Sequence, residues 1–153
     1  MPGGTWSNIN DAISGSTAAS QAARIATITD TLPGPATRVL LNLGVNDWDA
    51  GATKAAWESD MTTIIHGIHA KFPSMQVYIS RPWQRGHDTD ATTYSGWIDD
   101  LIAADPSYVH GGDDEAVWLK GGDNGATNTS DGKHYSAAGE TAKAAATKTA
   151  IGY

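Results

Sequence analysis

The pattern of apolar and polar positions predicts alternating strands and helices. Two short apolar runs, residues 38–43 and 76–80, have the composition of parallel strands buried on both faces. Between them, residues 54–72 carry apolar side chains at the 3.6-residue spacing of an amphipathic helix, with Thr53 as its N-cap and Pro73 as its stop. Strand, helix and strand in this order form a βαβ unit, which predicts a parallel sheet.

The rest of the chain is expected to add helices and one short strand. The further helices are predicted at residues 17–31, 92–104 and 136–150. A short strand is predicted at 108–110, and the Gly- and Asp-rich segments 111–115 and 121–125 are expected to be turns. The stretch 121–132 is too long for a simple connection, which predicts an active-site loop.

Composition indicates one globular domain over residues 1–153. Hydrophobic residues make up 40% of the chain and charged residues 18%, which suits a single core. The net charge of −7 argues against nucleic acid as a partner. The chain has no cysteine, which excludes thiolate catalysis and cysteine zinc sites. No apolar run approaches the roughly 18 residues of a membrane span, and the first residues lack the features of a signal peptide. We therefore expect no membrane partner, and either a protein that is made in the cytoplasm or a processed or truncated chain whose native location the sequence leaves open.

Two polar blocks lie at junctions where α/β proteins bind ligands. The first, Gly44-Val-Asn-Asp47, directly follows the first predicted strand, and Asn46 could present a side-chain N–H to a developing oxyanion. The second, Asp131-Gly-Lys-His134, precedes the last helix. There Asp131 could accept from one ring nitrogen of His134 and leave the other nitrogen as a general base. Each block alone also fits an ordinary turn, and together they predict a site for acyl transfer.

These blocks resemble the conserved blocks of SGNH (GDSL-type) hydrolases. Residues 43–48 resemble the Gly-x-Asn-Asp block of that family, and residues 131–134 resemble its Asp-x-x-His block. Gly15 resembles the family glycine whose backbone N–H faces the oxyanion. The resemblance extends from Gly15 to the C-terminus.

The resemblance implies a fold and an activity. The fold would be α/β, a three-layer α/β/α sandwich of flavodoxin-like type, and the activity would be hydrolysis of carboxyl or acetyl-sugar esters of small molecules, without a cofactor. His134 would be the base, Asp131 the residue that orients it, and Gly15 and Asn46 the oxyanion donors. The Gly-Asp-Ser block that carries the family's nucleophilic serine does not occur in this sequence. The domain is therefore expected to be truncated and to lack the first strand of the family sheet.

Two other functions stay open without that serine. Asp47, Asp131 and His134 should converge at one crevice, where three such ligands would hold zinc or another divalent metal and hydrolyse carboxyl or phosphoryl esters. The other alternative is a non-catalytic binding or assembly module that retains only the fold. Trp48 and Trp83 follow the ends of two strands and are predicted to form the crevice rim, where they and Asp47 would contact the substrate.

The expected loss of the first strand also predicts a homodimer. That strand would lie beside residues 38–43, so their backbone groups would lack a partner on one side. Exposed edges of this kind pair with other chains, and an unpaired buried backbone group costs roughly 1–3 kcal/mol. Two copies are expected to pair antiparallel along residues 38–43. An exchange of residues 1–31 between the two subunits is another route to a dimer. The rival to both is a monomer in which residues 1–13 fold back into the vacant position.

Overall fold

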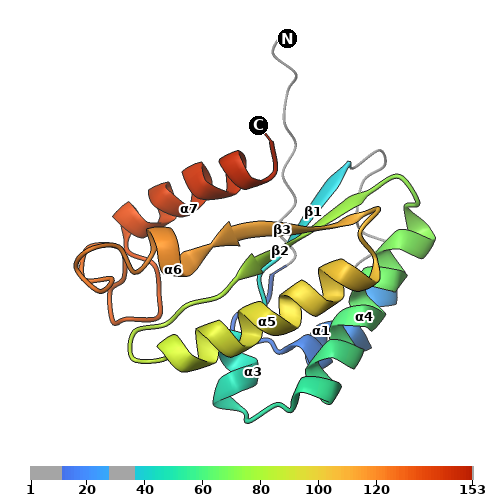
Figure 1. The fold of residues 1–153 in the computed structure, drawn as a ribbon, viewed down its shortest axis with the longest axis horizontal. Coiled ribbons are helices and arrows are strands. Elements are labelled where there is room, and N and C mark those ends of the chain that lie inside the picture. The colour runs from blue at the N-terminus through green and yellow to red at the C-terminus, as the bar shows by residue number, and fades with distance from the viewer. Residues whose placement is uncertain (1–11, 28–36, 153) are drawn as a thin grey trace, which may run out of the picture.

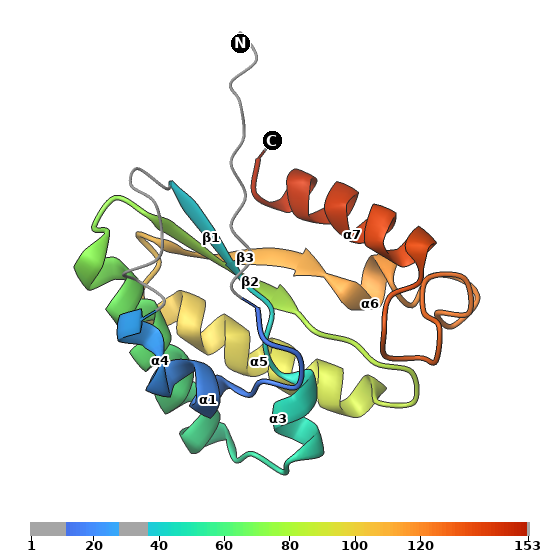
Figure 2. The same cartoon turned by 180° about the vertical axis from the view of Figure 1, so that it is seen from behind.

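The protein, seen in a computed structural model that describes residues 12–27 and 37–152, has three layers. Strands β1 (Arg38–Leu41), β2 (Gln76–Arg81) and β3 (Val109–Asp114) form a parallel sheet in the order β1-β2-β3. The helices are α1 (Ala18–Ala23), α3 (Val45–Asp49), α4 (Lys54–Lys71), α5 (Asp88–Ala104), α6 (Glu115–Trp118) and α7 (Ala137–Ala150). Helices α1, α4 and α5 lie on one side of the sheet and α7 on the other (Figure 1, Figure 2). The predicted three-layer α/β/α fold is confirmed.

Helix α4 forms as its sequence pattern predicted. The Thr53 side chain accepts the backbone N–H of Ala56, and the helix ends at Phe72, next to Pro73. One face of the helix is fully buried and consists of Trp57, Met61, Ile64, Ile65 and Ile68. This face packs in the same core as Val77 and Ile79 of β2. Burial of each large apolar side chain stabilises the fold by about 1.5–3 kcal/mol, so α4 and β2 form the rigid base of the site.

Several predicted boundaries were wrong, and the largest error concerns β3. The strand runs on to Asp114, through glycines that were predicted to form a turn. At Gly112 a Cβ atom would lie 2.9 Å from backbone atoms of Ile79 and Ser80, so this glycine allows close strand packing rather than a turn. The other differences are that β1 ends at Leu41 and α5 begins at Asp88. Helix α1 covers Ala18–Ala23, and residues 28–31 of the helix predicted there lie outside the described residues.

Strand β1 lies at one side of the described sheet. Among residues 12–27 and 37–152 its one hydrogen-bonded neighbour is β2. The expected loss of a first strand and the alternative of a folded-back segment both concern residues 1–13, of which residues 1–11 lie outside the described part. The pairing of two copies along residues 38–43 stays a prediction.

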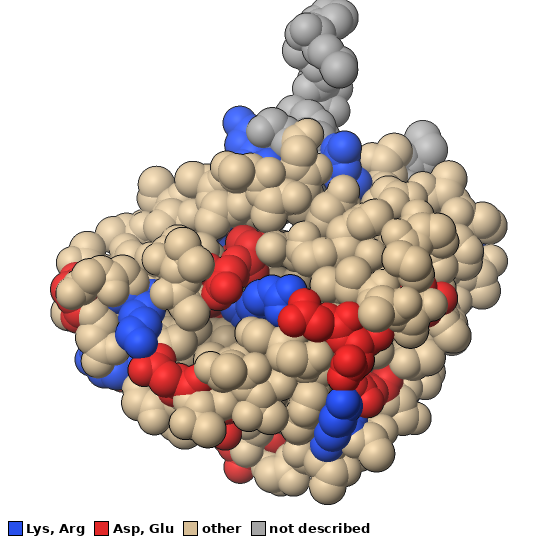
Figure 3. All heavy atoms as spheres, in the orientation of Figure 1, with Lys and Arg blue, Asp and Glu red and all other residues tan. Residues whose placement is uncertain are grey.

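The surface gives two further observations. On the face shown in Figure 3, basic side chains lie beside acidic ones, and no broad basic area is visible. Within the described ranges, no helix has the length and apolar character needed to cross a membrane.

Candidate active site

The turn after β1 positions Asn46 through a glycine that cannot be replaced without strain. Gly44 has a φ of 138°, and a Cβ atom there would lie 2.9 Å from Pro82 Cγ and 3.2 Å from a ring carbon of Tyr94. This turn begins α3 and places Asn46 in its first helical turn. The Asn46 Nδ2 atom donates to the backbone oxygen of Ser16 at 3.0 Å. An amide nitrogen carries two hydrogens, so the second N–H can serve a ligand.

Gly15 lies in a tight turn beside Asn46. The turn is closed by a hydrogen bond of 3.1 Å from Ser16 N to the Ile13 oxygen, and Gly15 has a φ of 76°. The Asn46 bond to Ser16 ties this turn to the end of β1. The two predicted oxyanion donors are therefore brought together by contacts between segments about 30 residues apart.

The buried side chain of Asp47 supports this arrangement through a hydrogen bond to the start of helix α1. It is only 3% exposed, and its Oδ1 atom accepts the backbone N–H of Ala18 at 2.9 Å, which holds the start of α1. Burial raises the pKa of the Asp47 carboxyl above its usual value and outweighs the hydrogen bond from Ala18. Asp47 is not among the cavity-lining residues. Its observed contact supports the start of α1, and its contact with a substrate stays a prediction.

Asp131 and His134 form a close pair in the loop before α7. His134 Nδ1 and Asp131 Oδ2 lie 2.7 Å apart, and Asp131 Oδ1 accepts the backbone N–H groups of His134 at 2.8 Å and Lys133 at 2.9 Å. These bonds, first those from His134, hold the pKa of Asp131 well below its usual value. With a proton on Nδ1, the imidazole presents Nε2 as an acceptor. The ring is largely exposed, at 71% of its side-chain area.

One cavity of about 580 Å³ brings these segments together. Gly15, Asn46 and His134 all line it, with Ser14 and Ser16 on either side of Gly15. Its apolar wall comes from β1, from Ile25 and from α4. A cavity of this size is typical of small-molecule sites. The polar end combines an imidazole with amide donors, which are the groups that acyl transfer uses.

The two predicted rim tryptophans differ in their positions relative to the cavity, and their contact with a substrate stays a prediction. Trp83 is 1% exposed, its Nε1 atom donates to Asp88 at 2.8 Å, and it lines the cavity from the inside. Trp48 stacks on the His87 ring, with centroids 5.9 Å apart, and is not a lining residue. Both rings pack against neighbouring side chains, because the turns after their strands direct them inward.

The predicted metal site is not formed by the residues proposed for it. In the described part of the chain, no group of three or more His, Asp or Glu side chains is arranged to hold a metal ion. Asp47 is buried against Ala18, while Asp131 is bonded to His134. Asp47 is therefore engaged apart from the Asp131–His134 pair.

Sequence reasoning missed a buried polar network next to His134. It consists of Asn42, Ser80, Asp113, Glu115, Trp118, Tyr135, Lys143 and Thr147. Glu115 and Tyr135 line the cavity with His134. The sequence did contain a signal for this network, because the acidic residues Asp113 and Glu115 are two positions apart at the end of a strand. Treating residues 111–115 as a turn concealed it.

The comparisons with known proteins establish the family. The chain belongs to the GDSL-like lipase/acylhydrolase family, whose model matches residues 3–142. A search of curated proteins gave no match.

Two solved structures share the fold. The chain is similar to a carbohydrate esterase family 3 structure from Talaromyces cellulolyticus, with 23% identity and a TM-score of 0.66 over 86% of this chain. It is also similar to a mutant form of the esterase AlinE4, with 19% identity and a TM-score of 0.62 over 94% of this chain. The chain spans 64% of the length of the first structure and 74% of the second.

Proposed function

We propose that this protein hydrolyses ester bonds of small molecules, with His134 as the general base. The observation that carries the proposal is the Asp131–His134 pair, 2.7 Å apart, on the same cavity as Gly15 and Asn46. Membership of the GDSL-like lipase/acylhydrolase family supports it. The substrate class is carboxyl or acetyl-sugar esters, and similarity to a carbohydrate esterase supports the sugar esters.

The chemistry follows from the donors and acceptors at the polar end of the cavity. His134 Nε2 takes a proton from the nucleophile as it attacks the carbonyl carbon, and Asp131 stabilises the resulting imidazolium. The carbonyl oxygen, now negative, accepts hydrogen bonds from the Gly15 backbone N–H and the Asn46 side chain. His134 then returns the proton to the leaving alkoxide, which yields an acid and an alcohol.

The proposed nucleophile is a water molecule. The sequence has no Gly-Asp-Ser block. Ser14 and Ser16 line the cavity, but the hydrogen bond from the imidazole of His134 goes to Asp131, and neither serine is bonded to it. Water attack consumes one water per ester and leaves no covalent intermediate. We therefore expect a fluorophosphonate to leave the protein unlabelled, and a stoichiometric adduct on Ser14 or Ser16 would instead establish a serine mechanism.

Hydrolysis of p-nitrophenyl acetate and of an acetylated sugar, each with and without a chelator, tests the function. The proposal predicts product release that exceeds the uncatalysed rate and is unaffected by chelation. Activity that disappears on chelation and returns with zinc would favour the metal-dependent alternative. No hydrolysis of either ester would overturn the proposal and favour a non-catalytic module.

A further inference from the structure

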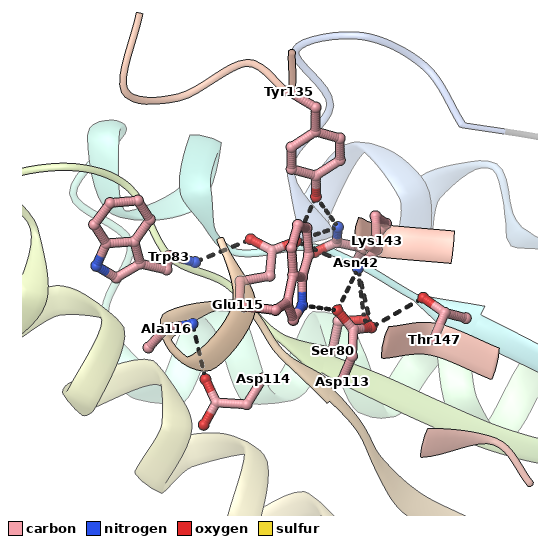
Figure 4. Close-up of polar contacts among 11 residues, drawn as sticks. Asn42, Ser80, Trp83, Asp113, Asp114, Glu115, Ala116, Tyr135, Lys143 and Thr147 are labelled. Carbon is pink, nitrogen blue, oxygen red and sulfur yellow. Dashed lines mark hydrogen bonds and ion pairs between the residues drawn. The ribbon is translucent and has the colours of Figure 1, made fainter. Parts of the chain in front are cut away.

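A buried carboxylate lies directly behind the loop that carries His134. Glu115 is 2% exposed, yet its two oxygens accept four hydrogen bonds. Oε1 accepts from Asn42 Nδ2 at 3.0 Å, from Lys143 Nζ at 3.3 Å and from the Tyr135 hydroxyl, while Oε2 accepts the backbone N–H of Trp83 at 3.1 Å. Figure 4 shows these donors converging on the carboxylate. A carboxylate that accepts four hydrogen bonds is well suited to hold the donor groups in place.

The network that holds Glu115 joins the ends of the sheet strands to helix α7. Asn42 follows β1, Glu115 begins α6 directly after β3, and Lys143 belongs to α7 on the far side of the sheet. Lys143 Nζ also lies 2.9 and 3.0 Å from the two oxygens of Asp113, which is 4% exposed. Asn42 and Trp83 directly follow strands and Lys143 belongs to α7, so the donors tie Glu115 to three separate segments of the fold.

Tyr135 connects Glu115 to His134. It is the next residue in the chain, its hydroxyl donates to Glu115, and it accepts from Asn42 Nδ2 at 3.1 Å. The His134 side chain is 71% exposed and so has little packing of its own. Its place must therefore be set by its backbone, which is bonded to Asp131 on one side and continues into the anchored Tyr135 on the other.

We propose that Tyr135 and Glu115 are positioning residues for His134, which hold the imidazole in line with the oxyanion donors of the cavity. Asp131 orients the ring, and the Tyr135–Glu115 bond fixes the distance of the loop from the end of β1. Burial and the charge of Glu115 raise the pKa of Tyr135 far above its usual value, so the hydroxyl keeps its proton at neutral pH. This inference rests on the proposed function, because a positioned base matters only if His134 is the base.

Tyr135→Phe tests the inference, with Tyr108→Phe as its matched control. Tyr108 also bonds a carboxylate, that of Asp105, but it precedes β3 and so lies at the opposite end of the strand from Glu115. Both variants lose one hydroxyl-to-carboxylate bond, so losses of stability should be similar. We expect Tyr135→Phe to lower kcat on p-nitrophenyl acetate about tenfold with KM changed less than twofold, since misplacement of a catalytic group acts on the chemical step. Tyr108→Phe should leave both constants unchanged.

Backbone hydrogen exchange supplies a readout that does not depend on activity. In Tyr135→Phe, the amides of Ser130 and His134, which are bonded within the loop, should exchange about tenfold faster, while that of Ile79 in β2 is unchanged. If exchange in Tyr135→Phe is faster throughout the protein, or is unchanged in the loop, the inference is overturned. It is also overturned if the unmodified protein is active and Tyr135→Phe has the same kcat. If the unmodified protein hydrolyses no ester, the proposed function fails on its own, and the exchange result still decides whether Tyr135 anchors the loop.

Discussion

Removal of the Lys143 ammonium should destabilise the protein far more than removal of a surface lysine. Its side chain is 15% exposed and contacts Asp113 and Glu115, whose side chains are 1% and 3% exposed. Lys143→Met keeps the length and apolar stem but leaves two buried carboxylates without their shared cation. Breaking a buried ion pair costs roughly 3–5 kcal/mol. In a domain of this size, 1 kcal/mol shifts Tm by roughly 2–4 °C, so we expect Tm to fall by about 10 °C.

The pH dependence of this loss has a definite sign. In the native protein, burial tends to raise the pKa of Asp113, but Lys143 and hydrogen bonds from Ser80 and Trp118 outweigh it and lower the pKa. The Asp113 carboxylate therefore stabilises the native state at pH values above its ordinary pKa of 3.8. This stabilisation is lost as the pH falls through the pKa of Asp113 in the folded protein. In Lys143→Met the cost of burying the charged carboxylate dominates, so the pKa of Asp113 in the folded variant rises. Protonation of Asp113 then removes this cost and restores part of the lost stability. The stability difference should be largest at pH 7 and smaller near pH 4.

Urea denaturation at both pH values measures the effect, with Lys54→Met as the control. Lys54 pairs with Asp100 at 2.5 Å, but both side chains are at least half exposed, and exposed pairs contribute little. The control should therefore unfold near the wild-type midpoint. The reasoning is refuted if Lys143→Met unfolds with the wild type, or if its deficit is equally large at pH 4 and pH 7.

Three further predictions concern other parts of the structure. Gly132→Ala should impair ester hydrolysis more than Gly86→Ala in the same assay. Both glycines have positive φ, but a Cβ atom at Gly132 would lie 2.9 Å from Arg85 Cβ, whereas a Cβ atom at Gly86 would meet open space. Asp47→Asn should raise the urea midpoint at pH 7 more than at pH 4, because the raised pKa of Asp47 makes the native state lose stability as the pH rises above about 3.8. Sedimentation at micromolar concentration should give a species near twice 16.0 kDa if two copies pair along residues 38–43, and a single species near 16 kDa would exclude that pairing.

The sequence alone was sufficient to predict the elements whose local residue pattern determines their structure. Helix α4 could be predicted with its cap because its apolar spacing and Thr53 agree with the tertiary packing. The pairing of Asp131 and His134 could also be predicted, since residues three apart before a helix are near each other in any compact loop. In these cases, local preference and the fold point to the same structure.

Elements fixed by distant contacts could not be predicted in this way. Gly112 has the composition of a turn, and only the approach of the β2 backbone shows why a strand requires glycine there. Glu115 and Lys143 are 28 residues apart, and nothing local marks them as partners. Trp83 was expected at the crevice rim because it follows a strand, but its ring is buried in a cluster with Ala91 and Leu119, which come from distant parts of the chain.

The rate of hydrolysis of an activated ester by His134→Ala, relative to the unmodified protein, tests the central claim most directly. His66→Ala is the matched control, because His66 also pairs with a carboxylate, Asp105, at 3.0 Å, but it lies on α4 and outside the cavity. The proposed function predicts that His134→Ala abolishes hydrolysis above the uncatalysed rate while His66→Ala retains full activity. Wild-type activity in His134→Ala would contradict it and place the chemistry elsewhere on the protein.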